Sequence, residues 1–513
     1  QDSWKISGSL VLNYGLRYEI DSPIRETKRR TSAVVLDGGR PGAELLINPQ
    51  PGYQLDKNGW GPRAAVEWRA AGGTLLRAGA GITTLLTNLY QDNQLTGGTP
   101  FVVTPRITAA PGQFVPFGAP ITPAQLPPVY TLDGSLVFAS GDSSRVPGNT
   151  TMDVLRFEQG LAALSPGHQV TPLSLFGVAP DFENGYIGTW TAGVEQKLWG
   201  AAVNAAYVGT AGIKLPSMGY PNGYAGAGPA FAPYTEFDAA GRVTGGYGPV
   251  FLMTNRSHST YHALQVSAQK DLTASGLGFQ ASYTFSKSID DTSAVTGGFI
   301  SGYSGAVSQT APQNPLDTRA DRGPSSFDVK SSLAFSIFQD LHADRVAFLR
   351  HLGKIPVAGW QVMGIGTFMT GLPFTVYSGV QQTGAGSNGA DRPDQIGAPD
   401  LSTSRAVRED YFGLGAANPS LFRIPGSFGT LGRNTFRGPD FRNLDVALIK
   451  DTPLGSRAGG ELASLQFRAE FFNILNIVNF GLPSNILLGP GFGEITRTAG
   501  ASRQIQFSLK LIY

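Results

Sequence analysis

The chain has 513 residues, of which only 15% are charged, and its formal net charge is +2. Soluble domains carry roughly 25% charged residues, and the balance of signs gives no indication of a nucleic-acid partner. No run approaches the roughly 18 apolar residues that a membrane-spanning helix requires. The 67 Gly and 35 Pro indicate many turns and little helix, and the absence of Cys fits an oxidising compartment.

Twelve segments alternate apolar and polar residues with a period of two, which is typical of β-strands whose two faces differ. Strands of a transmembrane barrel have this pattern because one face meets lipid and the other meets a polar lumen. The sequence therefore predicts an all-β, antiparallel, up-and-down transmembrane barrel. In chain order the segments lie at residues 10–18, 64–69, 76–82, 190–198, 203–207, 262–269, 277–286, 329–337, 360–368, 443–448, 465–471 and 503–513, and the ninth is the least regular.

The connections between these segments alternate between short and long. The shortest lie at Gly72-Gly73, at Trp199-Gly200 and at residues 271–276, whereas residues 83–189 form the longest. An up-and-down barrel has short periplasmic turns and long extracellular loops, which alternate in this way. In a soluble Greek-key sandwich, nothing requires short and long connections to alternate along the chain. We expect the long loops to pack on one another above the barrel.

The last segment has one apolar and one polar face and ends on an aromatic residue. A strand of this kind resembles the recognition signal of bacterial outer-membrane barrels, which implies the barrel-assembly machinery as a partner. The polar face carries Gln504, Gln506, Ser508 and Lys510. The predicted membrane-assembly signal consists of Ile505, Phe507, Leu509, Leu511 and Tyr513.

Charged residues on the polar faces of two segments are candidates for lining the lumen. Arg17 and Glu19 belong to the first segment, and Arg468 and Glu470 belong to the eleventh. They would either hold a plug by ion pairs or form a structural network, and both interpretations stay open. Aromatic residues near segment ends indicate the membrane interfaces, with a carbohydrate or peptide grip as the alternative for the aromatic-rich loops. The interface candidates are Trp4, Trp68, Trp190, Trp199, Tyr207 and Trp360.

The sequence predicts no catalytic residue, cofactor or metal site, and therefore no enzyme. His258 and His262 are four residues apart, but they lie in a predicted strand rather than on a helix. The G-x-G-x-x-G pattern at Gly384–Gly389 is followed by Asp391-Arg392-Pro393, so no dinucleotide-binding helix begins there. Asp290-Asp291 ends the seventh segment and indicates a solvated rim, with a calcium site as the alternative.

Seven stretches over most of the chain carry a family resemblance: Gln1–Lys5, Leu12–Glu19, Gly61–Arg63, Tyr207–Gly209, Ser282–Ser288, Gly432–Asn434 with Arg437–Pro439, and Phe467–Asn476. Together they resemble the C-terminal barrel part of Oar-like TonB-dependent outer-membrane transporters. The resemblance implies a 22-stranded barrel of the Gram-negative outer membrane, with an N-terminal plug and a segment that engages TonB. We expect the plug and about ten strands to precede Gln1, and residues 1–513 to form one barrel domain.

The resemblance further implies a transporter or receptor that takes up a ligand too large for porins. Its expected partners are the lipid bilayer, an unknown ligand at the extracellular loops, and TonB through the missing N-terminal region. Two rival functions stay open. One is a complete 12-stranded barrel that is a passive pore or a membrane enzyme. The other is a soluble secreted adhesin or glycan-binding module, which would tolerate Phe507→Asp, whereas a lipid-facing charge would block membrane assembly.

Overall fold

The chain forms one large sheet, with smaller sheets built from its loops. The computed structural model describes residues 1–513 except 37–42, 51, 87–94, 97, 103–106, 109–125, 140–142, 164–168, 171–172, 224–227, 273–275, 294–311, 315–316, 343–357, 381, 384–390, 398–410, 412–420, 457–461 and 513. Within the described residues the large sheet has 15 strands, and all but one of its pairings, the parallel pair β12–β17, are antiparallel.

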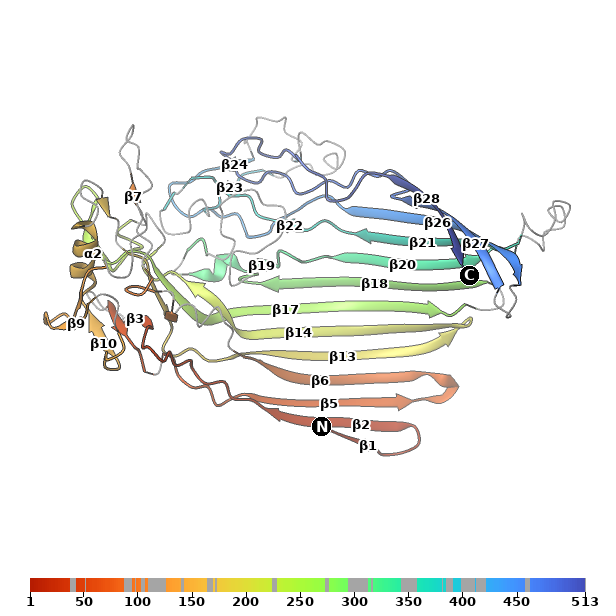
Figure 1. Cartoon of the computed structure of the whole chain (residues 1–513), viewed down its shortest axis with the longest axis horizontal. Helices are drawn as coiled ribbons and strands as arrows, with labels where there is room; N and C mark the ends of the chain where they lie inside the picture. Colours follow the sequence, from red (N-terminus) through yellow and green to blue (C-terminus); the bar gives the residue numbers. More distant parts are fainter. Residues whose placement is uncertain are drawn as a thin grey trace.

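All strands of this sheet except β12 (Leu175–Val178) and β19 (Gly323–Pro324) follow one another across it (Figure 1). In spatial order they are β1 (Asp2–Lys5), β2 (Leu10–Tyr18), β5 (Trp60–Arg69), β6 (Leu75–Leu85), β13 (Gly185–Leu198), β14 (Ala201–Gly219), β17 (Val250–Lys270), β18 (Leu277–Asp290), β20 (Ser331–Asp340), β21 (Trp360–Met369), β26 (Phe441–Ser456), β27 (Leu462–Phe472) and β28 (Gln504–Ile512).

All twelve predicted strands are confirmed, and the structure adds β1, which the sequence pattern missed. Only four residues long, β1 has Trp4 as its single large apolar residue, so it shows no period of two. It pairs with β2 through Trp4 opposite Leu12. Thirteen strands therefore follow one another from β1 to β28 in the described sheet, one more than the twelve predicted.

The predicted sorting of connections is also confirmed. Figure 1 shows the short turns at one end of the sheet and the long connections at the other. The hairpin of β13 and β14 turns on Trp199 and Gly200, whose φ values are 50° and 80°. Two consecutive positive φ angles match the right-handed twist of the flanking strands and make the tightest kind of hairpin. The added β1 keeps the alternation, since only residues 6–9 separate it from β2.

The register of the sheet puts the apolar and polar residues on opposite faces. On one face lie side chains that are large, apolar and exposed: Leu16, Trp68, Leu76, Val194, Tyr207, Leu264, Phe285, Ile337, Ile505, Phe507, Leu509 and Leu511. On the other lie Asn204, Gln265, Ser267, Gln280, Ser282, Ser336, Gln466, Gln506 and Ser508. An exposed apolar face of this extent suits lipid, so the polar face is the lumen side.

The irregular ninth segment, β21, has glycines where its outward face should be apolar. A Cβ on Gly366 would lie 2.4 Å from the ring of Phe335 on β20, so that ring already covers the glycine. The same ring stacks on Phe368 at a centroid distance of 6.3 Å. Neighbouring aromatics thus restore the apolar face that the sequence of β21 interrupts.

Trp190 and Tyr207 do not lie near strand ends as predicted, whereas their place at a membrane interface stays a prediction. They lie inside β13 and β14, which have 14 and 19 residues and exceed the 9–11 residues that cross a bilayer. Both rings meet His262 on the outward face, with the Tyr207 hydroxyl 2.7 Å from His262 Nδ1. Of the other candidates, Trp4, Trp68 and Trp199 lie beside short turns, whereas Trp360 begins β21 after the connection of residues 341–359.

The long connections carry their own secondary structure. One helix, α2 (Val154–Ala163), and two short 3-10 helices, η1 (Ala71–Gly73) and η3 (Thr318–Asp321), are present in the described part of the chain. The loop strands pair as β3 (Ser32–Leu36), β4 (Ala43–Ile47) and β10 (Thr150–Met152); β7 (Ile107–Thr108) and β11 (Gln169–Val170); β8 (Val129–Tyr130) and β9 (Leu136–Phe138); β15 (Thr235–Phe237) and β16 (Val243–Gly246); β22 (Pro373–Phe374) and β25 (Phe436–Arg437); and β23 (Asp394–Gln395) and β24 (Phe422–Arg423).

The buried core lies mainly among these loops, as the sequence predicts. One apolar cluster joins β3, β4, β8 and α2 around Ile47 and Phe157, which are almost fully buried. A second gathers around Phe374 and Phe436, and a third around Phe182 and Met253. The long connections therefore form a packed cap at one end of the sheet rather than separate loops.

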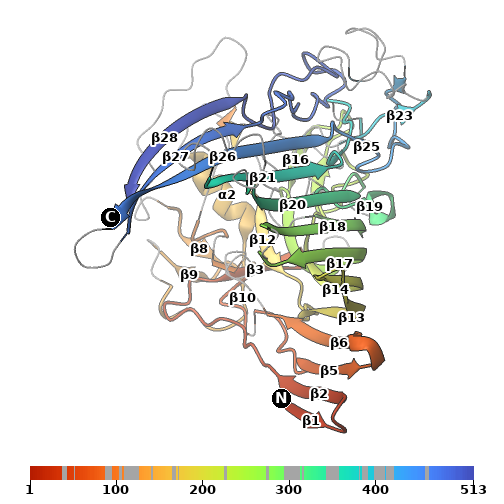
Figure 2. The same ribbon diagram turned by 90° about the vertical axis from the view of Figure 1, so that its right-hand side faces the viewer.

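The large sheet is curved and open in the described residues (Figure 2). Its order begins at β1 and ends at β28, and no pairing joins these two strands there. Among the described residues, no helix is both long and apolar enough to cross a membrane.

Candidate functional site

The terminal strand β28 has the two-faced geometry that its sequence predicts. Ile505, Phe507, Leu509 and Leu511 are all more than half exposed, and Phe507 reaches 66%. Phe507 stacks on Phe467 of β27 at a centroid distance of 6.3 Å, which extends the apolar face across both strands. Tyr513 lies outside the described residues. Whether this strand directs membrane assembly stays a prediction.

The candidate lumen charges form ion pairs on the polar face. Arg468 Nη2 lies 3.6 Å from Glu470 Oε1 on the same strand. Arg17 pairs with Glu19, which lies one residue beyond the end of β2 and not within it as predicted. Glu19 donates its backbone N–H to the carbonyl of Gly59 at 2.9 Å, next to the pair of Tyr18 and Trp60, so it continues the pairing of β2 with the chain before β5.

A further charge cluster on this face escaped the sequence analysis. Arg77 on β6 lies between Glu195 on β13, at 3.1 Å from Nη1 to Oε2, and Glu67 on β5, at 3.9 Å from Nε to Oε1. The three residues are on adjacent strands: Glu67 is directly opposite Arg77, whereas Glu195 is diagonal to it, two residues beyond Gly193 on the same face. The sequence pattern places all three residues on the polar faces of their strands, but it does not show the strand register that brings them together. The lumen face therefore carries charge clusters toward both sides of the sheet.

Two long loops are joined by a buried and a partly buried arginine, from the Gly432–Asn434 and Arg437–Pro439 motifs. Arg433 forms an ion pair with Asp290, donates to the Asp321 carbonyl at 2.6 Å and donates to Ser293 Oγ at 3.0 Å. Arg437 pairs with Asp328 and donates to the Gly371 carbonyl at 3.2 Å. These motifs therefore fasten the connection after β18 to the connection after β21.

The prediction of a solvated rim at Asp290-Asp291 is wrong for Asp290. Its side chain is only 3% exposed, because Arg433 and Ser293 cover and bond its carboxylate. Asp291 accepts the backbone N–H of His258 at 3.1 Å. Among the described residues no group of His, Cys, Asp or Glu has a metal-binding arrangement, so the calcium alternative gains no support.

A second buried ion pair lies in the same loops. Arg392 Nη1 lies 2.6 Å from Asp321 Oδ1, and the two side chains are 3% and 4% exposed. Burial raises the pKa of Asp321, while the neighbouring Arg392 opposes that shift. Gln313 contacts both partners: its backbone N–H donates to Asp321 Oδ1 at 3.4 Å, and its Oε1 accepts the Arg392 backbone N–H at 3.2 Å. The arrangement stabilises loop packing and has no open access for a substrate.

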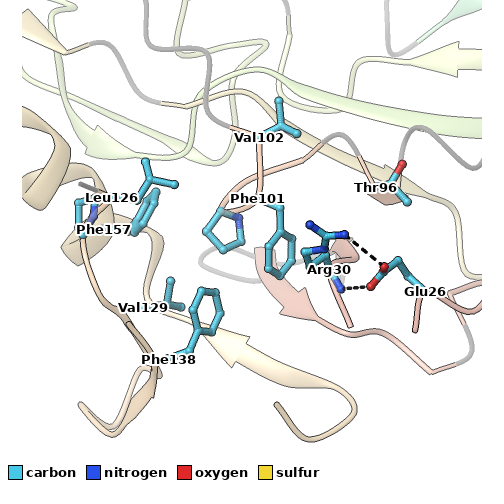
Figure 3. Close-up of a pocket in the computed structure, with 11 residues that line it drawn as sticks. Glu26, Arg30, Thr96, Phe101, Val102, Leu126, Val129, Phe138 and Phe157 are labelled. Carbon is cyan, nitrogen blue, oxygen red and sulfur yellow. Dashed lines mark hydrogen bonds and ion pairs between the residues drawn. The ribbon is translucent and has the colours of Figure 1, made fainter. Parts of the chain in front are cut away.

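A pocket of about 270 Å³ lies in the cap, between the connections after β2 and β6 (Figure 3). Its apolar wall combines residues from α2, β8, β9 and the segment around residue 101. Phe101 and Phe138 stack at a centroid distance of 5.8 Å, nearly parallel at 6°. Gly160 lets α2 approach closely, since a Cβ there would lie 2.6 Å from Pro127. The lining residues are Glu26, Arg30, Thr96, Pro100, Phe101, Val102, Leu126, Pro127, Val129, Phe138 and Phe157.

The polar end of the pocket is made by the chain just after β2. Glu26 Oε2 accepts the backbone N–H of Arg30 at 2.7 Å, and Glu26 Oε1 lies 3.7 Å from Arg30 Nη2. Figure 3 shows both side chains on the side of the pocket opposite Leu126 and Phe157. Arg29 anchors this segment by donating to the Val146 carbonyl at 2.7 Å. No sequence pattern indicates this pocket, because its walls come from segments as far apart as Glu26 and Phe157.

A titratable group lies on α2 next to the pocket wall. Burial raises the pKa of Glu158 from 4.5 to about 7, although its carboxylate accepts the backbone N–H of Leu173 at 2.6 Å. That hydrogen bond joins α2 to the chain leading into β12. The protonation of Glu158 is therefore tied to how the helix is held in the cap.

The other candidate motifs add no chemistry. His258 and His262 both lie on β17, as predicted, and His262 bonds Tyr207. His168, His351 and the pattern at Gly384–Gly389 lie outside the described residues. The features that the structure brings together are thus a lipid-compatible face, a charged lumen face and a packed cap with a pocket.

These features define a β-barrel protein of the outer membrane. Residues 1–506 match the family model described as outer membrane beta barrel domain, and the chain belongs to this family. Its location is therefore the bacterial outer membrane. No protein with a curated description matches the chain.

The solved structures that the chain matches share little sequence with it. The outer membrane transporter YddB from Escherichia coli is 11% identical, with a TM-score of 0.41, over 98% of this chain and 45% of that chain. The siderophore receptor PirA from Acinetobacter baumannii is 8% identical, with a TM-score of 0.42, over 99% and 44%. The ferripyoverdine receptor from Pseudomonas aeruginosa is 8% identical, with a TM-score of 0.41, over 99% and 37%. The chain thus spans less than half the length of these proteins.

Proposed function

We propose that this chain is the barrel portion of a TonB-dependent outer-membrane transporter or receptor of the Oar-like kind, which takes up a ligand too large for porins. The observation that carries the proposal is the cap, in which long connections form three apolar clusters and enclose a pocket. A passive pore needs no packed structure over its mouth, whereas a receptor needs an external surface that binds its ligand.

The open edges of the sheet support the proposal that residues 1–513 are the C-terminal part of a larger barrel. Backbone groups of an edge strand cannot stay unpaired in lipid, so β1 and β28 need further partners. We assign that role to strands that precede residue 1. The rival of a complete barrel would instead require β1, with only four residues, to close against the nine-residue β28.

The lumen charges fit a barrel that holds a plug. Arg77 with its two glutamates, and Arg468 with Glu470, present both signs of charge to the interior. Such side chains would bind a plug by ion pairs that salt and local rearrangement can break. The proposal assigns no catalytic role to any residue of this chain, and TonB would act through the region that precedes it.

Conductance in planar bilayers tests the proposal without knowledge of the ligand. The complete gene product is expected to show no steady current, because a plug fills its lumen. Removal of the plug segment is expected to give a steady open channel. A steady current through the complete product would contradict the proposal and favour the passive pore.

A further inference from the structure

The pocket in the cap is smaller than the pockets that enclose drug-sized ligands. Its volume of about 270 Å³ lies just below the roughly 300–1,000 Å³ of pockets that enclose drug-sized ligands. Eight of its lining residues are apolar, and three are phenylalanines, namely Phe101, Phe138 and Phe157. Such walls favour an aromatic ring or a branched aliphatic group over a sugar.

The polar end of the pocket has spare capacity for an anion. A guanidinium carries five N–H donors in a planar fork that matches a carboxylate. Among the described residues, the nearest acidic group to Arg30 is Glu26, at a loose 3.7 Å, and the Arg30 side chain is half exposed. Glu26, in contrast, already accepts the backbone N–H of Arg30 at 2.7 Å, so it is less available to a ligand ammonium.

Apolar walls and a cation at one end together fit a carboxylate attached to an apolar group. We propose that this pocket binds the carboxyl-terminal residue of a peptide, with an aromatic or branched side chain against Phe101 and Phe157 and the terminal carboxylate on Arg30. The proposal rests on the proposed uptake function and names the class of ligand for its external site. A free aromatic acid has the same chemistry, and the test below separates the two sources.

Calorimetric titration of the complete gene product, folded in detergent micelles, tests the proposal with four probes. They are the tripeptide Gly-Gly-Phe, its C-terminal amide, the tripeptide Gly-Gly-Asp, and 3-phenylpropionate. Gly-Gly-Phe is expected to bind at least ten-fold more tightly than the amide and than Gly-Gly-Asp. Equal binding of acid and amide would overturn the proposal. Binding of 3-phenylpropionate as tight as that of the tripeptide would assign the pocket to free acids and overturn the peptide ligand.

A matched pair of variants locates the binding. Arg30→Gln is expected to lower the affinity for Gly-Gly-Phe to that of the amide, while leaving the amide unchanged. Arg25→Gln removes an equal charge from an exposed residue of the same segment that does not line the pocket, and is expected to bind like the unchanged chain. Equal effects of the two substitutions would show a non-specific charge effect and overturn the assignment to Arg30.

The two proposals fail separately. Conductance tests uptake without any ligand, so a pocket that binds no peptide leaves the transporter proposal standing. A steady pore in the complete gene product would remove the transporter proposal even if Gly-Gly-Phe binds.

Discussion

At the scale of single residues, the cap depends on buried arginines that join separate loops. Arg433 is 8% exposed, and its partner Asp290 is 3% exposed. Arg433→Met leaves the Asp290 carboxylate buried without its cation, which is expected to destabilise the loop contact by about 3–5 kcal/mol. Hydrogen exchange of residues 312–330 and 421–437 measures the effect as faster exchange in both segments.

Arg319→Met is the control for this prediction, because Arg319 is 93% exposed and lies 3.8 Å from Asp317. An exposed pair of this kind is worth about 0–1 kcal/mol, so exchange should change little. If the two variants show the same hydrogen-exchange rates in residues 312–330 and 421–437, Arg433 does not hold the loops together.

Glu158 predicts a pH dependence of cap stability. Its pKa is raised from 4.5 to about 7 in the folded chain by burial, so the folded state binds a proton that the unfolded state has released. The resulting stabilisation is complete below pH 4.5 and is lost as pH rises through about 7. Its size is on the order of 2–3 kcal/mol. Thermal unfolding at pH 5 and at pH 8, with the protease resistance of the cap as the readout, measures this loss of stability.

Glu158→Gln provides the comparison for this pH effect. Its side-chain oxygen still accepts the Leu173 N–H but carries no charge, so the part of the pH dependence that Glu158 causes is expected to disappear. The variant should be more stable than the original chain at pH 8 and similar to it at pH 5. An unchanged difference between the two pH values in the variant would assign the pH dependence to other groups.

Residue roles were the least predictable from the sequence. The outward residues of β28 followed directly from their period of two, which needs no partner. Arg433 and Arg30 gave no such signal, because their functions arise from partners brought close only by folding. Asp290 shows the same limit, since the pattern that ends a strand cannot reveal that a loop 143 residues later covers it.

At the scale of elements, β28 makes a sharp prediction for membrane assembly. Phe507 is 66% exposed on the apolar face, and Phe507→Lys would place a charge in lipid at a cost of about 2–4 kcal/mol. Less folded protein is expected in the outer membrane, measured as the heat-modifiable fraction on gels.

The adjacent Gln506→Lys serves as the control, because Gln506 is on the polar face opposite Glu470. It should assemble normally. Equal yields of Phe507→Lys and Gln506→Lys would mean that the apolar face of β28 does not meet lipid.

Element positions were largely predictable because strand periodicity is a local property. All twelve predicted strands exist, and β1 was missed since four residues are too few to show a period. The strands β13 and β14 are longer than expected, which moved Trp190 and Tyr207 from strand ends into strand interiors. The small loop sheets escaped prediction because strands of two to five residues are too short to show a clear period.

At the scale of the whole molecule, the alternation of connection lengths was the strongest sequence signal. It depends only on chain order, and the sheet confirms it, with long connections at one end and short turns at the other (Figure 1). The packing of the cap could be expected from loop length, but not its three clusters, whose contacts span distant segments.

The orientation of the sheet in the membrane is the central claim, and cysteine labelling tests it most directly. The chain has no Cys, so each introduced thiol is the only one it contributes. Leu132→Cys lies in the cap between β8 and β9, and Trp199→Cys lies in the short turn between β13 and β14. Both positions are exposed, at 60% and 93%. A large polyethylene-glycol maleimide should label Leu132→Cys in intact cells and Trp199→Cys only after the outer membrane is permeabilised. The reverse pattern, or labelling of both in intact cells, would contradict an outer-membrane barrel with its long connections outside.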